Sequence, residues 1–226
     1  MGMNEYDRDG LLERLDKAVE EGEVETAVEL TQEALKSIGP VDILNALQEA
    51  MQRVGQLFED QVLFLPDLYM TAQAMQACSE LLRPELKKTG RGKAMGKIVL
   101  GTVENDIHDI GKNIVRTVLS ANGFEVFDIG INCPADRFIQ KALEVDADIV
   151  AMSSLLTITM PEMIKVVNAL HELKARHPIL TLIGGAPVTQ AFADHVGADG
   201  FAPDAFAAVE AAAELVARKE KAAVDN

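Results

Sequence analysis

The sequence predicts an α/β protein in two parts, a bundle of four helices followed by a doubly wound parallel sheet. Residues 7–88 carry apolar side chains at helical spacing, without the alternation that is typical of strands. From Lys97 onward, short apolar runs alternate with helical segments. This alternation favours a parallel sheet with right-handed crossovers, as in Rossmann-like or flavodoxin-like domains.

The first part divides into four amphipathic segments at Gly22, Gly39-Pro40 and Pro66. Short connections between such segments favour an antiparallel bundle. The side chains that we expect to face inward are Leu11, Leu12, Leu15 and Val19, then Val24, Ala27, Val28, Leu30, Ala34 and Leu35, then Ile43, Leu44, Leu47, Met51, Val54 and Phe58, and finally Leu68, Ala72, Met75 and Leu82.

A segment rich in glycine and basic residues separates the two parts. Residues 89–96 include three glycines, which predicts a flexible, exposed linker. We therefore expect a helical domain at 1–88, a linker at 89–96 and a second domain at 97–226. Within the second domain, the pattern predicts strands at 97–102, 124–128, 148–153, 179–183 and about 200–201, and helices at 110–121, 135–144, 160–175, 188–195 and 204–219.

Composition excludes several classes of partner. The formal net charge of −15 disfavours nucleic acid and anionic membranes, because both require a basic surface. The polar N-terminal segment does not resemble a signal peptide, and no apolar run approaches the length of a membrane span. Cys78 and Cys133 lie far apart without a CxxC motif, which favours reduced thiols and a cytoplasmic protein.

The candidate site begins directly after the first strand. His108 lies in the segment that leaves the carboxyl end of 97–102, where open α/β sheets bind ligands. Asp106 and Asp109 flank this histidine, and Gly111 would allow a ligand or backbone to come close. An imidazole oriented by a carboxylate is a typical metal ligand, because one nitrogen binds the metal while the other donates to the carboxylate.

Phosphate-binding loops of the common kinds are missing from the sequence. Neither G-x-x-x-x-G-K-[ST] nor G-x-G-x-x-G occurs, which disfavours nucleotide hydrolysis and dinucleotide binding by those loops. Gly184-Gly185 follows a predicted strand; alone it indicates a tight turn, but its position at a strand end favours a ligand site.

Three motifs together carry a family resemblance: Asp106-x-His108-x-x-Gly111, Ser153-x-Leu155 and Gly184-Gly185. This signature resembles the cobalamin-binding proteins that hold their corrinoid base-off/His-on. The resemblance implies that His108 replaces the lower base of the cofactor on cobalt, while the displaced nucleotide tail is buried beside the sheet. It implies cofactor contacts from Asn105, Asp106, Ile107, His108, Asp109, Ile110, Gly111, Ser153, Leu155, Thr157, Gly184, Gly185, Asp204 and Ala205.

The same family places a hydroxyl group on the aspartate beside the ligating histidine. The matching position here is Thr159 in place of serine, so the hydroxyl is retained. The resemblance implies a relay of His108, Asp106 and Thr159 that adjusts the proton of the imidazole as the axial bond breaks and forms again.

The segment from Phe58 to Pro66 resembles the cap of cobalamin-dependent methionine synthase. By that resemblance Phe58 and Leu65 lie over the reactive upper face of the corrin, and the linker serves as the hinge on which the cap moves aside. Judged from their spacing alone, the same two residues would be ordinary bundle core.

The resemblance as a whole implies the corrinoid subunit of a three-component methyltransferase system. Such a protein has no catalytic residues of its own and cycles between methylcobalamin and cob(I)alamin. Its expected partners are a methyltransferase specific for methanol, a methylamine, a methoxylated aromatic or a betaine, a second methyltransferase that uses tetrahydrofolate or coenzyme M, and a reductive activator protein.

Three alternatives remain open from the sequence. A cobalamin-dependent sensor would normally add a DNA-binding module, which the acidic charge disfavours. A mutase subunit would use adenosylcobalamin, but this reading leaves the Phe58/Leu65 segment unexplained. The third alternative is a flavodoxin-like domain that binds some other ligand.

Overall fold

The chain divides into two compact units, Met1–Lys93 and Ala94–Asn226, and each is described by itself. The computed structural model describes residues 5–88, 94–173 and 177–224. The predicted linker at 89–96 therefore lies mostly outside the described residues. None of the helices in these ranges is long and apolar enough to cross a membrane.

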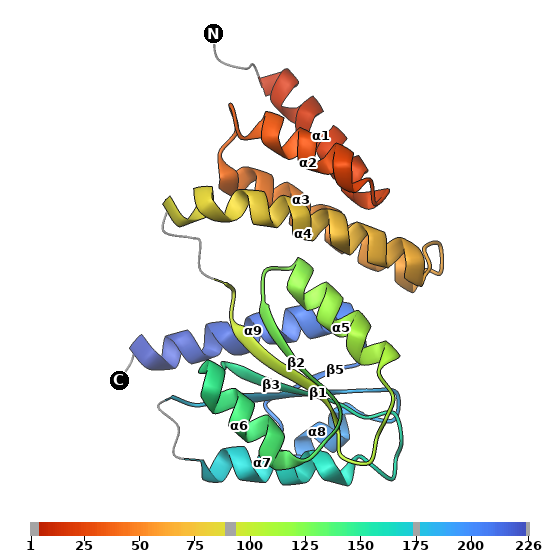
Figure 1. Ribbon diagram of the computed structural model, residues 1–226, viewed down its shortest axis with the longest axis vertical. Helices are drawn as coiled ribbons and strands as arrows, with labels where there is room; N and C mark the ends of the chain where they lie inside the picture. The colour runs from red at the N-terminus through yellow and green to blue at the C-terminus, as the bar shows by residue number, and fades with distance from the viewer. Residues whose placement is uncertain (1–4, 89–93, 174–176, 225–226) are drawn as a thin grey trace. The chain divides into compact units, whose positions relative to one another are not determined.

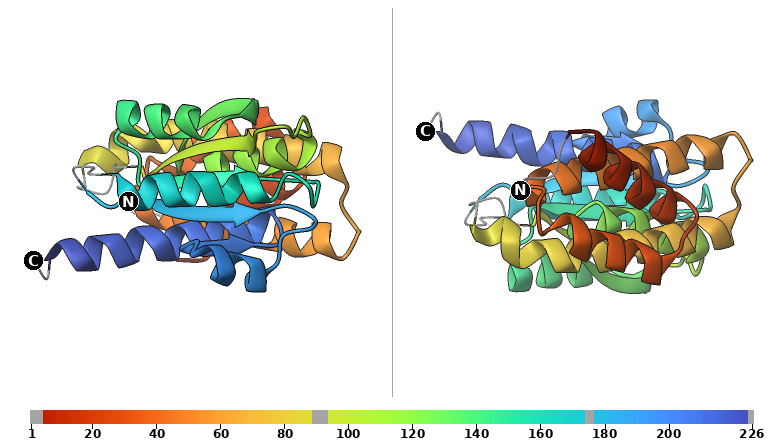
Figure 2. Two further views of the ribbon diagram at one scale, coloured as in Figure 1. Left: turned by 90° about the horizontal axis from the view of Figure 1, so that it is seen from below. Right: turned by 90° about the horizontal axis from the view of Figure 1, so that it is seen from above.

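The first unit is a helical bundle, as the sequence predicts (Figure 2, right). Its apolar stripes are buried against one another, with Leu15, Ile43, Leu47, Met75 and Leu82 fully enclosed. Its helices are α1 (Glu5–Glu20), α2 (Val24–Ala34), α3 (Pro40–Glu59) and α4 (Leu65–Lys88).

Glycine and proline set the ends of these helices. Gly22 adopts the left-handed conformation after α1 (φ 70°), and a Cβ there would lie 2.6 Å from Cβ of Met70. The hydroxyl of Thr71 in α4 also donates to the carbonyl of Glu20 at 3.2 Å. These contacts fix the α1–α2 turn against α4, while Pro40 occupies the first turn of α3.

The second unit is a five-stranded parallel sheet with helices on both faces (Figure 1). The strand order is β2-β1-β3-β4-β5, which is the doubly wound, flavodoxin-like order. The strands are β1 (Lys97–Val103), β2 (Glu125–Cys133), β3 (Ile149–Ser153), β4 (Leu180–Gly184) and β5 (Gly200–Ala202). The helices are α5 (Ile110–Ala121), α6 (Ala135–Val145), α7 (Pro161–Glu172), α8 (Gln190–Val196) and α9 (Ala205–Val224).

Alternate residues of the central strands face two separate cores. One face packs against α5 and α9, and the other packs against α6, α7 and α8. Ile98, Ile149 and Leu182 belong to the first core, while their neighbours Val99, Val150 and Ile183 belong to the second. Because both faces are covered, these strands are almost continuously apolar, which is why their positions could be predicted.

Three elements differ from the sequence expectation by three or more residues at one end, and one of them is α9, which is expected at 204–219 and continues to Val224. The strand expected at 124–128 continues to Cys133, because β2 pairs with β1 through two register shifts that let it run past the regular ladder. The helix expected at 160–175 ends at Glu172, since Leu173 has an extended backbone (ψ 127°).

The strand order reverses between β1 and β3, and this reversal positions the site. The connection after β1 leads to α5 on one face, and the connection after β3 leads to α7 on the other. The loops therefore diverge at the carboxyl ends of these two strands, which is where doubly wound sheets bind ligands.

Candidate functional site

The loop after β1 presents His108 in a fixed orientation. Nδ1 of His108 lies 2.7 Å from Oδ1 of Asp106, and the backbone N–H of His108 donates to the same oxygen at 3.1 Å. Because an ionised carboxylate can only accept hydrogen bonds, Nδ1 must carry the proton of a neutral imidazole. The lone pair of that imidazole is then on Nε2, and 45% of the side chain is exposed.

Asp106 is completely buried beneath the histidine and remains ionised. Burial acts to raise its pKa, but hydrogen bonds from the N–H groups of Leu155 and His108, from the His108 ring and from the Thr159 hydroxyl outweigh this effect and lower the pKa to about 2. The carboxylate therefore stays a pure acceptor throughout the physiological pH range.

The loop after β3 supplies the donors for the second carboxylate oxygen. Oδ2 of Asp106 accepts from the N–H of Leu155 at 2.7 Å and from the hydroxyl of Thr159 at 3.0 Å. The contact between Asp106 and Thr159 thus joins the two loops across the switch point of the sheet.

Ser154 is a residue of this site that the sequence analysis missed. Its buried hydroxyl lies 2.8 Å from that of Thr159, 3.4 Å from Oδ2 of Asp106 and 3.1 Å from the carbonyl of Leu156. The family resemblance assigns its neighbour Ser153 to the nucleotide tail and not to Asp106, so that assignment stays a prediction, while Ser154 is the serine whose hydroxyl lies beside Asp106. The strand pattern gives no signal for this contact, because Ser154 lies in the loop after β3.

A second missed residue, Asn132, supports the His108 loop from the end of β2. Its side-chain oxygen accepts from the N–H of Asn105 at 2.8 Å, and its own N–H donates to the carbonyl of Asp106 at 2.9 Å. Both asparagines have positive φ, 63° for Asn105 and 50° for Asn132, a conformation that asparagine tolerates better than most residues. The extension of β2 beyond the regular ladder makes this contact possible.

A buried ion pair anchors the start of α5. The ammonium group of Lys112 is almost fully enclosed and pairs with Asp128 of β2 and with the side chain of Asn113. Asp128 also accepts from the N–H of Gly130 and lies 3.6 Å from Arg116. The same pair thus fixes both the helix after the histidine and the irregular part of β2.

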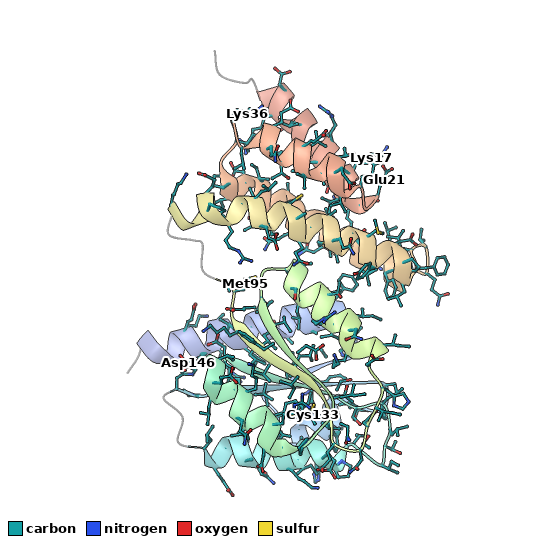
Figure 3. All side chains as sticks on the ribbon, viewed as in Figure 1. Lys17, Glu21, Lys36, Met95, Cys133 and Asp146 are labelled. Atoms are coloured by element: carbon teal, nitrogen blue, oxygen red, sulfur yellow. The ribbon has the colours of Figure 1, made fainter. Side chains whose placement is uncertain are left out.

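Cys133 closes this strand and is labelled in Figure 3. Its Sγ lies 3.3 Å from the carbonyl oxygen of Ile129 and 3.4 Å from that of Ile131. Cys78 and Cys133 are both free and buried, and burial raises the pKa of each thiol. Neither thiol is therefore a ready nucleophile or metal ligand.

Apolar side chains surround His108 on the surface. Ile107 is 70% exposed and Ile158 is 81% exposed, and Ile110 and Leu155 are also exposed. Asp109 and Thr157 lie among them at the surface. Large exposed apolar groups on two loops that meet beside an imidazole are typical of a binding face for a large, partly apolar ligand.

The Gly184-Gly185 pair has a role inside the protein. A Cβ on Gly184 would lie 2.7 Å from the carbonyl oxygen of Ala202, and one on Gly185 (φ 127°) would lie 1.9 Å from that of Ser154. The loops after β3, β4 and β5 approach too closely for any side chain here. This packing requires both glycines whether or not the backbone also lies against a ligand.

The remaining predicted contact residues lie at the ends of β3 and β5. Ser153 is half-buried and pairs in register with Gly184. Asp204 is the cap of α9, because its Oδ1 accepts from the N–H groups of Phe206 at 2.9 Å and Ala207 at 2.8 Å; Ala205 is buried beside it. Contacts of these residues with a nucleotide tail stay a prediction.

The two predicted cap residues belong to the first unit. Phe58 is half-buried near the end of α3, and Leu65 is 42% exposed at the start of α4. Leu65 is therefore not bundle core, in contrast to what its spacing alone would indicate. Around it the α3–α4 turn exposes Val62 and Phe64, and the start of α4 exposes Tyr69 and Met70.

The residues of the second unit fit a metal whose other ligands come from a macrocycle. Both oxygens of Asp106 are occupied by hydrogen bonds, so the site offers a single imidazole nitrogen surrounded by apolar groups. The space beyond Gly111 is open, with no atom within 4 Å of a Cβ built there. The fold and site thus define a Rossmann-like protein that presents one oriented histidine where the strand order of its sheet reverses.

Comparison with known proteins identifies the family. B12 binding domain families match residues 96–210 and residues 11–83. A corrinoid protein of Desulfitobacterium hafniense is 41% identical over 212 residues, 92% of this chain and 98% of the relative. Dimethylamine corrinoid protein 1 of Methanosarcina acetivorans is 42% identical over 211 residues, 93% of this chain and 99% of the relative. The chain belongs to the family of B12-binding corrinoid proteins of methyltransferase systems.

Solved structures agree with this assignment. A cobalamin-binding protein of Desulfitobacterium hafniense matches with a TM-score of 0.71 at 33% identity, covering 93% of this chain and 97% of that one. A chain of the methanol:cobalamin methyltransferase complex of Methanosarcina barkeri matches with a TM-score of 0.74 at 31% identity, covering 92% and 80%. The predicted resemblance and corrinoid cofactor are thereby confirmed, and a domain for an unrelated ligand is excluded.

Proposed function

We propose that the protein is a corrinoid methyl carrier. It exchanges a methyl group between a substrate-specific methyltransferase and a second methyltransferase that delivers the group to tetrahydrofolate or coenzyme M. When bound, the corrinoid supplies a cobalt atom that can accept and release a methyl group. The chain contributes the environment of that atom, and the partner enzymes contribute substrate activation.

One observation carries the proposal, namely the pairing of His108 Nδ1 with a buried, ionised Asp106. This pairing fixes the imidazole tautomer with its lone pair on Nε2 and increases the basicity of that nitrogen. Asp106 in turn is held by Thr159, whose hydroxyl can adjust its hydrogen bond as the proton of the imidazole moves toward or away from the carboxylate. The same residues would therefore hold the axial ligand and modulate its strength.

The apolar groups around the site serve to exclude water. Ile107, Ile110, Leu155 and Ile158 would lie against the corrin ring and shield the axial bond. In the first unit, Phe58 and Leu65 would cover the opposite face and move aside when a partner enzyme approaches. The predicted hinge at 89–96 would permit that movement.

The named relatives narrow the class of methyl donor. Several curated relatives are dimethylamine corrinoid proteins, and one is a trimethylamine corrinoid protein. One similar structure belongs to a methanol:cobalamin methyltransferase complex. These names support a methylamine or methanol system, with a methoxylated aromatic or betaine as the further possibilities. A reductive activator protein and a cytoplasmic location complete the proposal.

The test begins with the protein reconstituted with hydroxocobalamin, desalted and reduced. It is then incubated separately with methyltransferases specific for methylamines, methanol, methoxylated aromatics and betaines, each with its substrate. We expect one class to change the visible spectrum of the bound corrinoid to that of the methylated form, and a tetrahydrofolate- or coenzyme M-dependent enzyme to reverse it. Tight corrinoid binding without loading by any of the four classes would contradict the carrier role and favour a corrinoid sensor or a mutase subunit.

A further inference from the structure

The backbone of His108 is held by a residue outside the His108–Asp106–Thr159 relay. Asp106 binds its N–H and Nδ1, as described above. The backbone carbonyl of His108 instead accepts from the hydroxyl of Thr102 at 2.8 Å. Nε2 is then the polar atom of His108 for which the described part of the chain supplies no partner.

Thr102 is fixed within the sheet and can therefore anchor the loop that carries His108. It lies near the carboxyl end of β1, a central strand, and pairs in register with Ser153 of β3. Its side chain is completely buried, so the hydroxyl needs a partner within the protein. That partner is the carbonyl of His108, six residues along the chain, and the loop between them therefore folds back over the end of its own strand.

We infer that Thr102 is a positioning residue for the axial imidazole, an inference that rests on the proposed role of His108 as ligand. Asp106 controls the tautomer and the rotation of the ring and is itself held by other elements, but its contacts leave the backbone carbonyl of His108, at the far end of the loop, to Thr102. Thr102 ties that loop to the sheet. The two contacts together fix Nε2 relative to the sheet, and a metal-binding constellation needs such fixed geometry to be effective.

The hydroxyl can be removed without changing the shape of the side chain. In Thr102→Val the hydroxyl is replaced by a methyl group, whereas Thr102→Ser keeps the hydroxyl and loses the methyl group. In the apoprotein, hydrogen exchange of the His108 N–H reports how firmly the loop is closed. We expect exchange on the order of tenfold faster in Thr102→Val, corresponding to the loss of one hydrogen bond, and near the wild-type rate in Thr102→Ser.

Cofactor binding gives the second readout. We expect the affinity of Thr102→Val for hydroxocobalamin to fall about tenfold, as for other outer contacts of metal ligands, and Thr102→Ser to restore it. The EPR spectrum of the Co(II) form should show weakened axial nitrogen coupling in Thr102→Val alone.

The outcomes separate positioning from simple stability. If Thr102 only stabilises the sheet, Thr102→Val will lower the melting temperature and leave two other quantities at their wild-type values. These are the exchange rate of the His108 N–H relative to that of the Val103 N–H, and the affinity for hydroxocobalamin. Such a result overturns the inference. Failure of the wild-type protein to retain corrinoid would instead refute the proposed function, and the exchange measurement in the apoprotein would still be interpretable.

Discussion

Gly185 lies directly against the backbone of Ser154, so that a Cβ at residue 185 would be 1.9 Å from the Ser154 carbonyl oxygen. The contact joins the loop after β4 to the loop that supplies donors to Asp106. The N–H of Ser154 donates to the carbonyl of Gly184 at 3.2 Å in the same region. A glycine in one loop therefore sets the position of the carboxylate's partners in another.

We predict that Gly185→Ala will destabilise the apoprotein by more than about 2 kcal/mol, because it adds both a backbone clash and an unfavourable φ. Urea denaturation of the apoprotein measures this change. Gly111→Ala is the matched control, since no atom lies within 4 Å of its Cβ and alanine favours a helix. Equal stability of Gly185→Ala and wild type would mean that the loops relax apart easily.

The control variant carries a prediction of its own. Gly111→Ala should fold at least as stably as wild type, yet retain less hydroxocobalamin after desalting, because its methyl group projects into space that we assign to the ligand. Undiminished retention would show that the corrin ring does not approach this turn of α5.

The parts of this site that could be predicted from the sequence are those that depend on the type of a side chain or on the apolar pattern of a strand. The order of strands and helices follows from the alternating apolar runs, and His108 with Asp106 follows from their place after β1. The contact of Thr159 with Asp106 could be anticipated only through the family resemblance, because the two residues are 53 positions apart.

Other contacts of the site are not indicated by any side-chain type or strand pattern in the sequence. The strongest donor to Asp106 from the second loop is the backbone N–H of Leu155, which every residue except proline possesses. Asn132 reaches the His108 loop only because two register shifts extend β2. The residues of this segment do not show where the register of the strand will shift. The family resemblance assigns the glycine pair to a ligand, which stays a prediction; its packing against Ala202 and Ser154 could not be predicted, because it depends on three loops meeting in space.

We predict that His108→Ala will abolish the axial nitrogen signal in the EPR spectrum of the Co(II) corrinoid form. The reason is that Nε2 is the imidazole nitrogen left for the metal once Asp106 has engaged Nδ1. His195→Ala is the control, because that exposed histidine lies in α8. A protein-derived nitrogen signal that survives in His108→Ala would remove this residue from the metal.

The stability of the apoprotein should depend on pH through Asp148, which directly precedes β3 at the end of the sheet away from His108. Burial acts to raise the pKa of this carboxyl, but hydrogen bonds from the Lys219 ammonium and the Lys97 N–H outweigh it and lower the pKa below its ordinary value. A lowered folded-state pKa gives stability that is present above the unfolded pKa and is lost as the pH falls through the folded one. Asp148→Asn should thus cost about 1 kcal/mol in urea denaturation at pH 7 and progressively less below pH ~4. If Asp148→Asn lowers the free energy of unfolding equally at pH 7 and below pH ~4, the charge of Asp148 does not contribute to stability.

The last prediction concerns the cap, where stability and protection can be separated. Leu65 is 42% exposed, so Leu65→Ala should change the stability of the apoprotein by no more than about 0.5 kcal/mol, whereas truncation of a core leucine costs about 2–5 kcal/mol. If Leu65 and Phe58 cover the corrin, Leu65→Ala and Phe58→Ala should each hasten the aerobic loss of the methyl group from protein loaded with methylcobalamin, as followed by visible absorption.

Phe64→Ala is the matched control, because Phe64 is exposed in the same turn but is not expected over the ring. Equal lifetimes in all three variants and wild type would mean that these side chains do not shield the cofactor. Shortened lifetimes in all three would instead assign protection to the whole apolar surface of the α3–α4 turn.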